Sequence, residues 1–183
     1  ERLMRATIAQ IPNGTYRYVD YLDNDGVELD KPVRIEVAVS VSEDTLHCDF
    51  TGTSEQTRGS FFAVRSGAQA SAYFALRAIT GPTMPTNGGC FRTVTLHLPE
   101  GSLVNPSEPA PVNSRTSTLK RLSSCIIGAL QTALPERVPA DGSSQLTVLM
   151  FGGRNAAGKP FIVGEFNAGG SGASRRLDGI DVI

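Results

Sequence analysis

The stretch DFTGTS, residues 49–54, places one carboxylate and three hydroxyl groups at the end of a run with strand-like alternation. Asp49 could move a proton, and Thr51 and Thr53 could donate hydrogen bonds to a polar substrate. A turn in which these side chains bond to nearby backbone amides also accounts for the motif, and local residue types favour that turn. We therefore take Asp49, Thr51 and Thr53 as the candidate catalytic residues, with a structural turn as the alternative.

The chain has only two histidines, which limits histidine-based mechanisms. His47 lies two residues before Asp49, so both side chains should point to one face of the expected strand. Such a pair could serve acid–base chemistry or supply two metal ligands, but a solvent-facing polar strand surface is the default explanation. His97 lies in another alternating run and is expected at the surface. The three cysteines lack metal-ligand spacing, so we predict no metal site within this chain.

Two segments have a physical bias toward anions. The expected helix start at Arg115 offers free amide groups, and its guanidinium group could hold a carboxylate or phosphate. The loop AGGSGASRR contains Gly169, Gly170, Gly172 and Arg175, whose amides and positive charge could surround an anion. Ordinary helix capping and a sterically crowded turn are the structural alternatives. We expect at least one of these glycines to adopt a backbone conformation that only glycine tolerates.

A third segment has the spacing of a phosphate-binding loop without its chemistry. Residues 153–159 read G-x-x-x-x-G-K, but the next residue is Pro160 in place of the Ser or Thr that binds magnesium. A phosphate-binding loop also opens a helix, whereas PFIVGEF is a β-rich run. Two apolar runs around a Gly/Asn-rich stretch predict a β-hairpin. We expect the isolated chain neither to bind nor to hydrolyse ATP.

A fourth segment, DNDG at residues 23–26, has the acidic composition of a calcium loop. The positions two residues before Asp23 and at the twelfth place of the motif hold Tyr21 and Pro32, which are not calcium ligands. A turn at Asp25-Gly26 between two strands is the better interpretation.

The composition is that of an ordinary globular protein. The 183 residues suffice for one domain with a sizeable core, and 17 basic against 18 acidic residues give no electrostatic case for nucleic acid or an anionic membrane. No apolar run approaches the roughly 20 residues that span a bilayer. Three scattered cysteines are typical of reduced thiols in a cytoplasm, which is the expected location.

Hydrophobic periodicity predicts an α+β fold. Alternating runs indicate strands in GTYRYVDYL, PVRIEVAVSVSE, TLHCDF and RTVTLHL, and the alternation allows Asp20 to share one face of the first with Tyr16 and Tyr18. Three- and four-residue steps indicate two main helices at about 64–80 and 115–134. We expect a mostly antiparallel β-sheet built from hairpins, with these two helices packed on it, as a single domain over residues 1–183.

The order of the motifs is more informative than any one of them. IPNGTYRYVDYLDNDG, DFTGTSEQTRGSFFAV, MPTNGGCFRTVTLHLPEGSLVNPSEPAPV and GGSGASRRLDG follow one another along the chain. Together they resemble the hydantoinase B/5-oxoprolinase family, the B-type subunits of ATP-dependent hydantoinases, oxoprolinases and ketone carboxylases. The resemblance runs from about Ile11 to the C-terminus. Subunits of this family are several times longer, so the chain is expected to be an internal segment of one.

The resemblance implies a two-part enzyme that opens a cyclic amide such as hydantoin or 5-oxoproline. An A-type subunit or fused domain would bind ATP, which activates a carbonyl oxygen as a phosphate ester before hydrolysis. ATP and a divalent metal are expected on that partner or elsewhere in the parent protein, and no cofactor in this segment. Asn87, in the block PTNGGCFR, is implied as a substrate-binding residue in addition to Arg115 and the glycine loop. A segment of a ketone carboxylase and a non-catalytic interaction domain are the alternatives.

Overall fold

The computed structural model describes residues 1–81, 84–144 and 146–181 of the chain. They divide into two compact units, Glu1–Pro139 and Ala140–Ile183, which are described separately. In the described residues no helix is long and apolar enough to cross a membrane.

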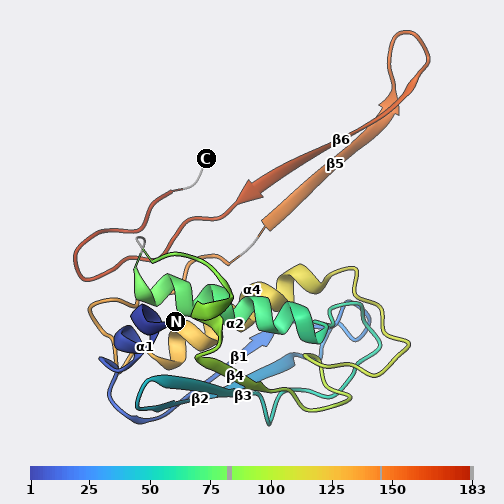
Figure 1. The fold of residues 1–183 in the computed structure, drawn as a ribbon. Helices are drawn as coiled ribbons and strands as arrows, with labels where there is room; N and C mark the ends of the chain where they lie inside the picture. The colour runs from blue at the N-terminus through green and yellow to red at the C-terminus, as the bar shows by residue number, and fades with distance from the viewer. Residues whose placement is uncertain (82–83, 145, 182–183) are drawn as a thin grey trace. The chain divides into compact units, whose positions relative to one another are not determined.

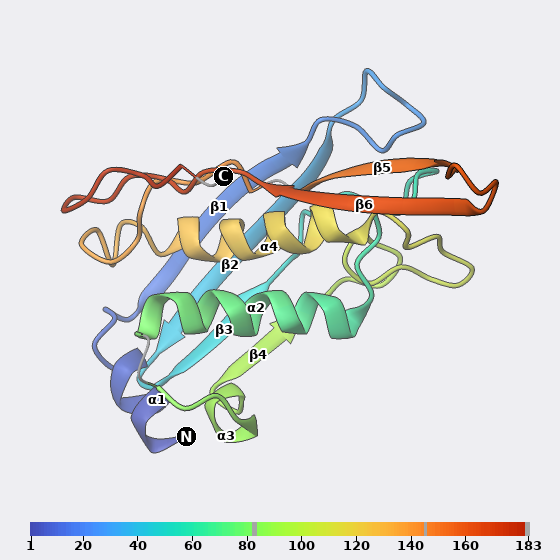
Figure 2. The same cartoon turned by 90° about the horizontal axis from the view of Figure 1, so that it is seen from above.

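The first unit contains a four-stranded sheet (Figures 1 and 2). Its strands are adjacent in the order of the sequence: β1 (Gly14–Leu22), β2 (Val33–Ser42), β3 (Thr45–Asp49) and β4 (Val94–His97). The pairs β1–β2 and β2–β3 are antiparallel, as the alternating runs predict. The tight turn between β2 and β3 contains Glu43, whose φ of 54° is in the left-handed region. The predicted α+β fold with a mostly antiparallel sheet is thus confirmed.

The fourth strand departs from the predicted hairpin pattern, because β4 pairs parallel to β3. Parallel neighbours need a crossover connection, and here the chain crosses the sheet through helix α2 (Arg65–Thr80) before it returns. A short helix, α3 (Gly88–Phe91), immediately precedes β4. The alternation of a strand does not encode the direction in which it pairs, so the sequence pattern could not distinguish the two arrangements.

Helices α2 and α4 (Arg115–Ala129) lie side by side over one face of the sheet (Figure 2). Small residues bring them close together: a Cβ at Gly67 would lie 2.9 Å from Leu119, and Ser71 Oγ donates to the Leu119 carbonyl oxygen at 2.8 Å. Both predicted helices are confirmed, although α4 ends at Ala129 and the residues up to 134 form turns. Their buried faces form the core with the inner face of the sheet, including Tyr16 and Tyr18.

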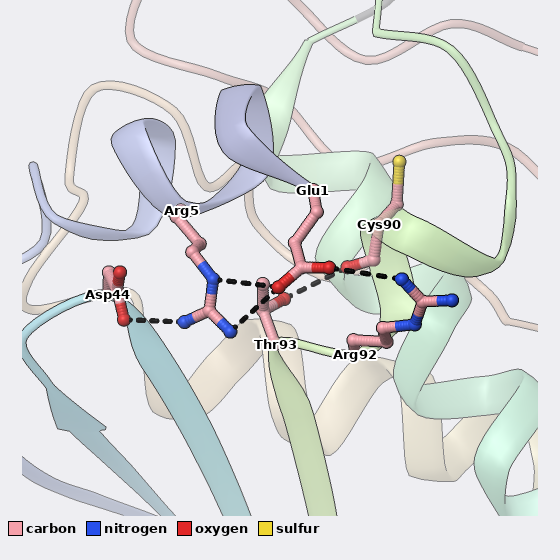
Figure 3. Close-up of polar contacts among 6 residues, drawn as sticks. All are labelled: Glu1, Arg5, Asp44, Cys90, Arg92 and Thr93. Atoms are coloured by element: carbon pink, nitrogen blue, oxygen red, sulfur yellow. Dashed lines mark hydrogen bonds and ion pairs between the residues drawn. The ribbon is translucent and has the colours of Figure 1, made fainter.

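The N-terminal helix α1 (Arg2–Ile8) is attached to the sheet by a surface ion network (Figure 3). The guanidinium group of Arg5 donates to Glu1 at 3.0 and 3.1 Å and to Asp44 at 2.7 Å. Arg92 reaches the second oxygen of Glu1 at 3.3 Å. Hydrogen bonds from Arg5 and Arg92 lower the pKa of the Glu1 carboxyl. The network joins the first helix to the β2–β3 turn and to the residues before β4.

The second unit consists of the hairpin β5 (Leu146–Arg154) and β6 (Pro160–Ala168) with the segments that flank it. The two strands are antiparallel, so the predicted hairpin is confirmed. Asn155 forms the turn, because its side-chain oxygen accepts from the amides of Ala157 and Lys159 at 3.0 Å. Gly158 has a φ of 76°, which favours glycine. The sequence that mimics a phosphate-binding loop is therefore a tight hairpin turn.

Candidate functional site

The face of the sheet opposite the helices carries polar residues from all four strands. The strand registers align one residue from each strand in a row across this face: Arg17, Ala38, Asp49 and His97. Ala38 is the small member of the row and is 7% exposed. Asp49 therefore has an imidazole on the neighbouring strand β4 and a guanidinium group two strands away on β1.

A second row lies two residues away and contains hydroxyls and the other histidine: Thr15, Ser40, His47 and Thr95. His47 Nδ1 lies 2.8 Å from Thr95 Oγ1. Thr15 Oγ1 lies 2.9 Å from Ser40 Oγ. We refer to these two rows as the polar sheet face, and both histidine side chains on it are exposed.

The motif DFTGTS begins at the end of β3 and makes a turn. Asp49 Oδ1 accepts from the Thr51 amide at 2.9 Å and from Thr51 Oγ1 at 2.7 Å. Gly52 follows with a φ of 97°, and a Cβ there would lie 2.2 Å from the Glu36 carboxylate. The turn thus needs glycine for its backbone conformation and to leave space for the Glu36 carboxylate. One oxygen of Asp49 serves the turn, as the structural alternative for this motif requires.

The surroundings of Asp49 also favour the ionised form of its carboxyl group. Partial burial raises the pKa of its carboxyl, but the two Thr51 hydrogen bonds and the nearby His97 and His47 outweigh burial and lower it. A carboxyl group whose pKa is lowered is charged at neutral pH. It can then accept a hydrogen bond or attract a positively polarised group of a substrate. The direction suits an acceptor or electrostatic role rather than proton donation at neutral pH.

Thr53 and Ser54 have a different environment. Thr53 is 8% exposed, and its hydroxyl bonds both to the Glu36 carbonyl oxygen and to the Glu36 amide at 3.1 Å. Ser54 Oγ accepts from the Arg34 amide at 2.8 Å. These hydroxyls continue the hydrogen bonding of β2 after β3 has ended. Their geometry supports a structural role, whereas Thr51 is exposed.

An ion cluster lies next to the turn. Arg34 Nη1 is 2.8 Å from Glu36 Oε2 and donates to the Gly52 carbonyl oxygen at 3.3 Å. Arg17 Nη1 lies 4.0 Å from the other oxygen of Glu36. Together, the polar sheet face and this ion cluster present two carboxylates, two guanidinium groups and two imidazoles near one turn, which is chemistry suited to a small polar substrate.

A cavity of about 440 Å³ adjoins the end of the motif, with Lys31, Ser54 and Arg58 in its lining. Its wall is held by Asp25, which is 2% exposed. Asp25 Oδ1 accepts from the amides of Val27 and Glu28 at 2.8 and 2.7 Å, and Oδ2 accepts from those of Arg58 and Gly59 at 3.2 and 3.1 Å. The acidic DNDG segment thus ties the β1–β2 connection to the segment after DFTGTS.

The other predicted substrate-binding residues of the first unit lie elsewhere. Asn87 caps α3, where its side-chain oxygen accepts from the Gly89 amide at 3.0 Å. It lies before β4, whereas Asp49 pairs with the last residue of that strand. Arg115 begins α4 in the helix layer and donates to the Val112 carbonyl oxygen at 3.1 Å. The structure does not bring either residue to the polar sheet face.

The expectation that a glycine of this loop has a backbone conformation that only glycine tolerates was wrong. None of Gly169, Gly170 and Gly172 has φ in the left-handed region. The loop needs glycines for space: a Cβ at Gly172 would lie 1.8 Å from the Ala140 carbonyl oxygen, and one at Gly170 would lie 3.1 Å from that of Ile180. Backbone segments that pass this closely exclude side chains. Arg175, in the same loop, is exposed.

His97 is the residue of this face that sequence reasoning placed only at the surface. Its partner, Asp49, is 48 residues earlier, and only the parallel β3–β4 register brings them together. Among the described residues, no group of three or more His, Cys, Asp or Glu side chains could hold a metal ion.

Comparison with known proteins relates this fold to one family. A family model described as hydantoinase B/oxoprolinase matches residues 1–183. The chain is 29% identical over 194 residues to a putative B-type subunit of a D-/L-hydantoinase from Pseudomonas sp. (strain NS671), covering 100% of this chain and 32% of that one.

Two solved structures share the fold. The ATP-dependent caprolactamase of Pseudomonas jessenii matches with a TM-score of 0.83 and 26% identity, over 98% of this chain and 32% of that one. Nucleotide-free acetone carboxylase matches with a TM-score of 0.84 over 97% of this chain and 26% of that one; at 21% identity this likeness concerns the fold alone. The chain spans 29% and 32% of the length of the first two curated relatives it matches. On the match along its full length, the chain belongs to the hydantoinase B/oxoprolinase family.

Proposed function

We propose that the chain is part of a B-type subunit of an ATP-dependent hydrolase that opens a cyclic amide of the hydantoin or 5-oxoproline type. The observation that carries this proposal is the family match over all 183 residues. Relatives with this sequence pattern are named as the B-type subunit of a hydantoinase, as 5-oxoprolinase and as the beta subunit of caprolactamase, which are names of enzymes acting on cyclic amides.

The polar sheet face is the part of the first unit that suits such a substrate. A ring amide offers an N–H donor and a carbonyl acceptor, and the ionised Asp49 can accept from the former. The imidazoles of His47 and His97 provide donors beside it, and the exposed hydroxyl of Thr51, whose hydrogen is bonded to Asp49, can accept. Asp49 and Thr51 are the residues we propose in contact with substrate, with Thr53 holding the turn beneath them.

ATP is proposed to bind on an A-type partner subunit or fused domain, with its divalent metal. The hairpin turn at 153–159 supports this division, because it presents no helix N-terminus to a phosphate and has Pro160 at the position of the magnesium ligand. We further propose a cytoplasmic location, consistent with three cysteines that are all free and buried.

The test is a reconstitution. The complete reading frame that contains this segment is co-expressed with the adjacent A-type frame, and the purified complex is assayed for phosphate release from ATP with hydantoin, 5-oxoproline and caprolactam. The expected result is ATP hydrolysis that depends on one of these rings and yields the ring-opened acid. ATP hydrolysis that responds instead to acetone with bicarbonate assigns a ketone carboxylase. A complex inactive with all of them would leave an interaction role for the segment.

A further inference from the structure

The hairpin β5–β6 exposes an unusual amount of apolar side chain. Eight large apolar residues along its two strands are between 42% and 75% exposed: Val148, Leu149, Met150, Phe151, Phe161, Ile162, Val163 and Phe166. Scattered exposed apolar residues are ordinary on a protein surface, but a continuous set of this size indicates a binding surface.

The apolar residues occupy both faces of the hairpin. By the strand register, Val148, Met150, Ile162 and Phe166 share one face, and Leu149, Phe151, Phe161 and Val163 share the other. Only Arg154 and Glu165 are charged within the two strands. A strand pair with one wet face would alternate apolar and polar residues, whereas strands covered on both faces are apolar throughout.

The backbone of the hairpin is also incomplete as a sheet. In the part of the chain that the structure describes, β5 and β6 form a sheet of two strands, so each has one edge without a neighbour (Figure 1). A two-stranded hairpin alone is at best marginally stable in water. Unpaired edges readily accept a further strand.

The apolar composition of the hairpin is typical of a segment that is permanently buried. Surfaces that bind a partner transiently are about as apolar as the rest of a protein, whereas the interior of a chain is mostly apolar. The hydantoinase subunit and the caprolactamase chain, which match all or nearly all of this chain, are each about three times as long, since the match covers 32% of either one. These chains therefore contain twice as much polypeptide again that can cover a hairpin.

We propose that β5 and β6 are two strands of a larger sheet, completed and covered on both faces by apolar polypeptide of the same B-type subunit outside these 183 residues. The proposal rests on family membership and on the hairpin, and it makes no use of the catalytic assignment. Coverage by a second copy of the chain, by the first unit or by the A-type subunit are the competing outcomes.

The first experiment compares hydrogen exchange of the 183-residue chain with that of the polypeptide encoded by the complete reading frame, purified as a monomer without A-type subunit. The amides of 146–154 and 160–168 should exchange at least about 100-fold more slowly in the longer polypeptide. Slow exchange already in the 183-residue chain, as monomer or as dimer, overturns the proposal. So does protection that needs the A-type subunit, or a reading frame that adds no residues.

The second experiment uses a glycine of the hairpin as a probe of close contact. A Cβ at Gly152 would lie 3.7 Å and 3.9 Å from the nearest atoms, so a Cβ fits there without a clash within the hairpin. Gly152→Phe should leave the thermal midpoint of the 183-residue chain unchanged but lower that of the longer polypeptide by about 2 °C or more, because a packed neighbour must move. Ala156→Phe, in the exposed turn, is the matched control and should change neither. Equal midpoints for Gly152→Phe and the unmodified longer polypeptide would overturn the proposal.

Discussion

Asp49 has two sets of neighbours with different consequences for chemistry. One of its oxygens is bonded to Thr51 within the turn, while the row across the sheet places His97 beside it. The turn alone does not require a charge, because an amide oxygen would accept the same two bonds. The histidines, in contrast, interact with the charge itself. A substitution that preserves shape and removes charge therefore separates the two roles.

We expect Asp49→Asn to lower kcat of the reconstituted enzyme about 10²-fold or more, because it removes the charge from the proposed substrate site. The amide oxygen keeps the Thr51 bonds, so the thermal midpoint should hardly move. Steady-state kinetics and a melting curve on the same preparation check both statements. Thr53→Val is the contrasting variant: it removes two bonds to β2 and should lower stability. Full activity of Asp49→Asn would leave the motif only its structural turn.

Asp25 stabilises the folded chain, and its contribution to the free energy of unfolding depends on pH. Backbone hydrogen bonds from Glu28 and Val27 outweigh burial and lower the pKa of its carboxyl from 3.8 to about 2. Because the folded pKa lies below the unfolded value, its stabilisation is complete above about pH 3.8 and is lost as pH falls from there toward 2.

We expect Asp25→Asn to lower the urea midpoint of the 183-residue chain at pH 7, since the amide group cannot accept on both sides of the carbon. The deficit relative to the natural sequence should shrink as pH falls from 4 toward 2. Urea titrations at pH 7, 4 and 3 measure this difference. A deficit that stays constant across that range would show that the charge of Asp25 contributes nothing.

At the scale of elements, the second unit depends on two segments whose backbones pass close to each other. The amide of Ser143 donates to the Gly170 carbonyl oxygen at 3.1 Å, and that of Ala140 donates to the Ala173 carbonyl oxygen at 2.8 Å. Two such bonds hold the residues before β5 against those after β6. Their spacing leaves no room for a Cβ at Gly172.

Gly172→Ala should therefore destabilise the second unit by about 1–3 kcal/mol, because its Cβ would meet a backbone oxygen that cannot rotate away. Gly152→Ala is the matched control in the same unit and has room for its methyl group. Hydrogen exchange of 140–144 and 169–173 measures the local effect. Unchanged exchange for Gly172→Ala would mean that the two segments separate in solution.

Arg175 tests whether the same loop also binds an anion. Arg175→Gln should leave the thermal midpoint of the chain unchanged, because the residue is exposed. An anion role predicts weaker binding of an acidic substrate in the reconstituted enzyme, with a difference that added salt reduces. Equal affinities for the two proteins would assign the loop to architecture alone.

At the scale of the whole molecule, the described residues hold a candidate substrate face, and the segment with the spacing of a phosphate-binding loop is a hairpin turn. We expect calorimetry of the 183-residue chain with Mg-ATP to show no binding heat, since the G-x-x-x-x-G-K segment is a hairpin turn followed by a proline. Lys159→Ala is the control and should behave identically. Binding in the micromolar range that disappears in Lys159→Ala would contradict this expectation.

Local patterns were sufficient for much of the fold. Steps of three and four residues located α2 and α4, alternation located the strands, and Pro160 excluded a phosphate-binding loop. These features depend on neighbours within a few positions, where side-chain type and backbone preference act directly. The order of the motifs carried the family resemblance, which the match along the full chain confirmed.

Contacts between distant segments were decided by the tertiary structure. The crossover through α2 makes β4 parallel to β3, and only this pairing places His97 beside Asp49. Likewise, Gly172 is required because Ala140 passes beside it, and not because of its own dihedral angles. The physical reason is the same in both cases. A strand of given alternation can pair in either direction, and a glycine can serve a turn or a close approach, until long-range packing fixes which neighbour it has.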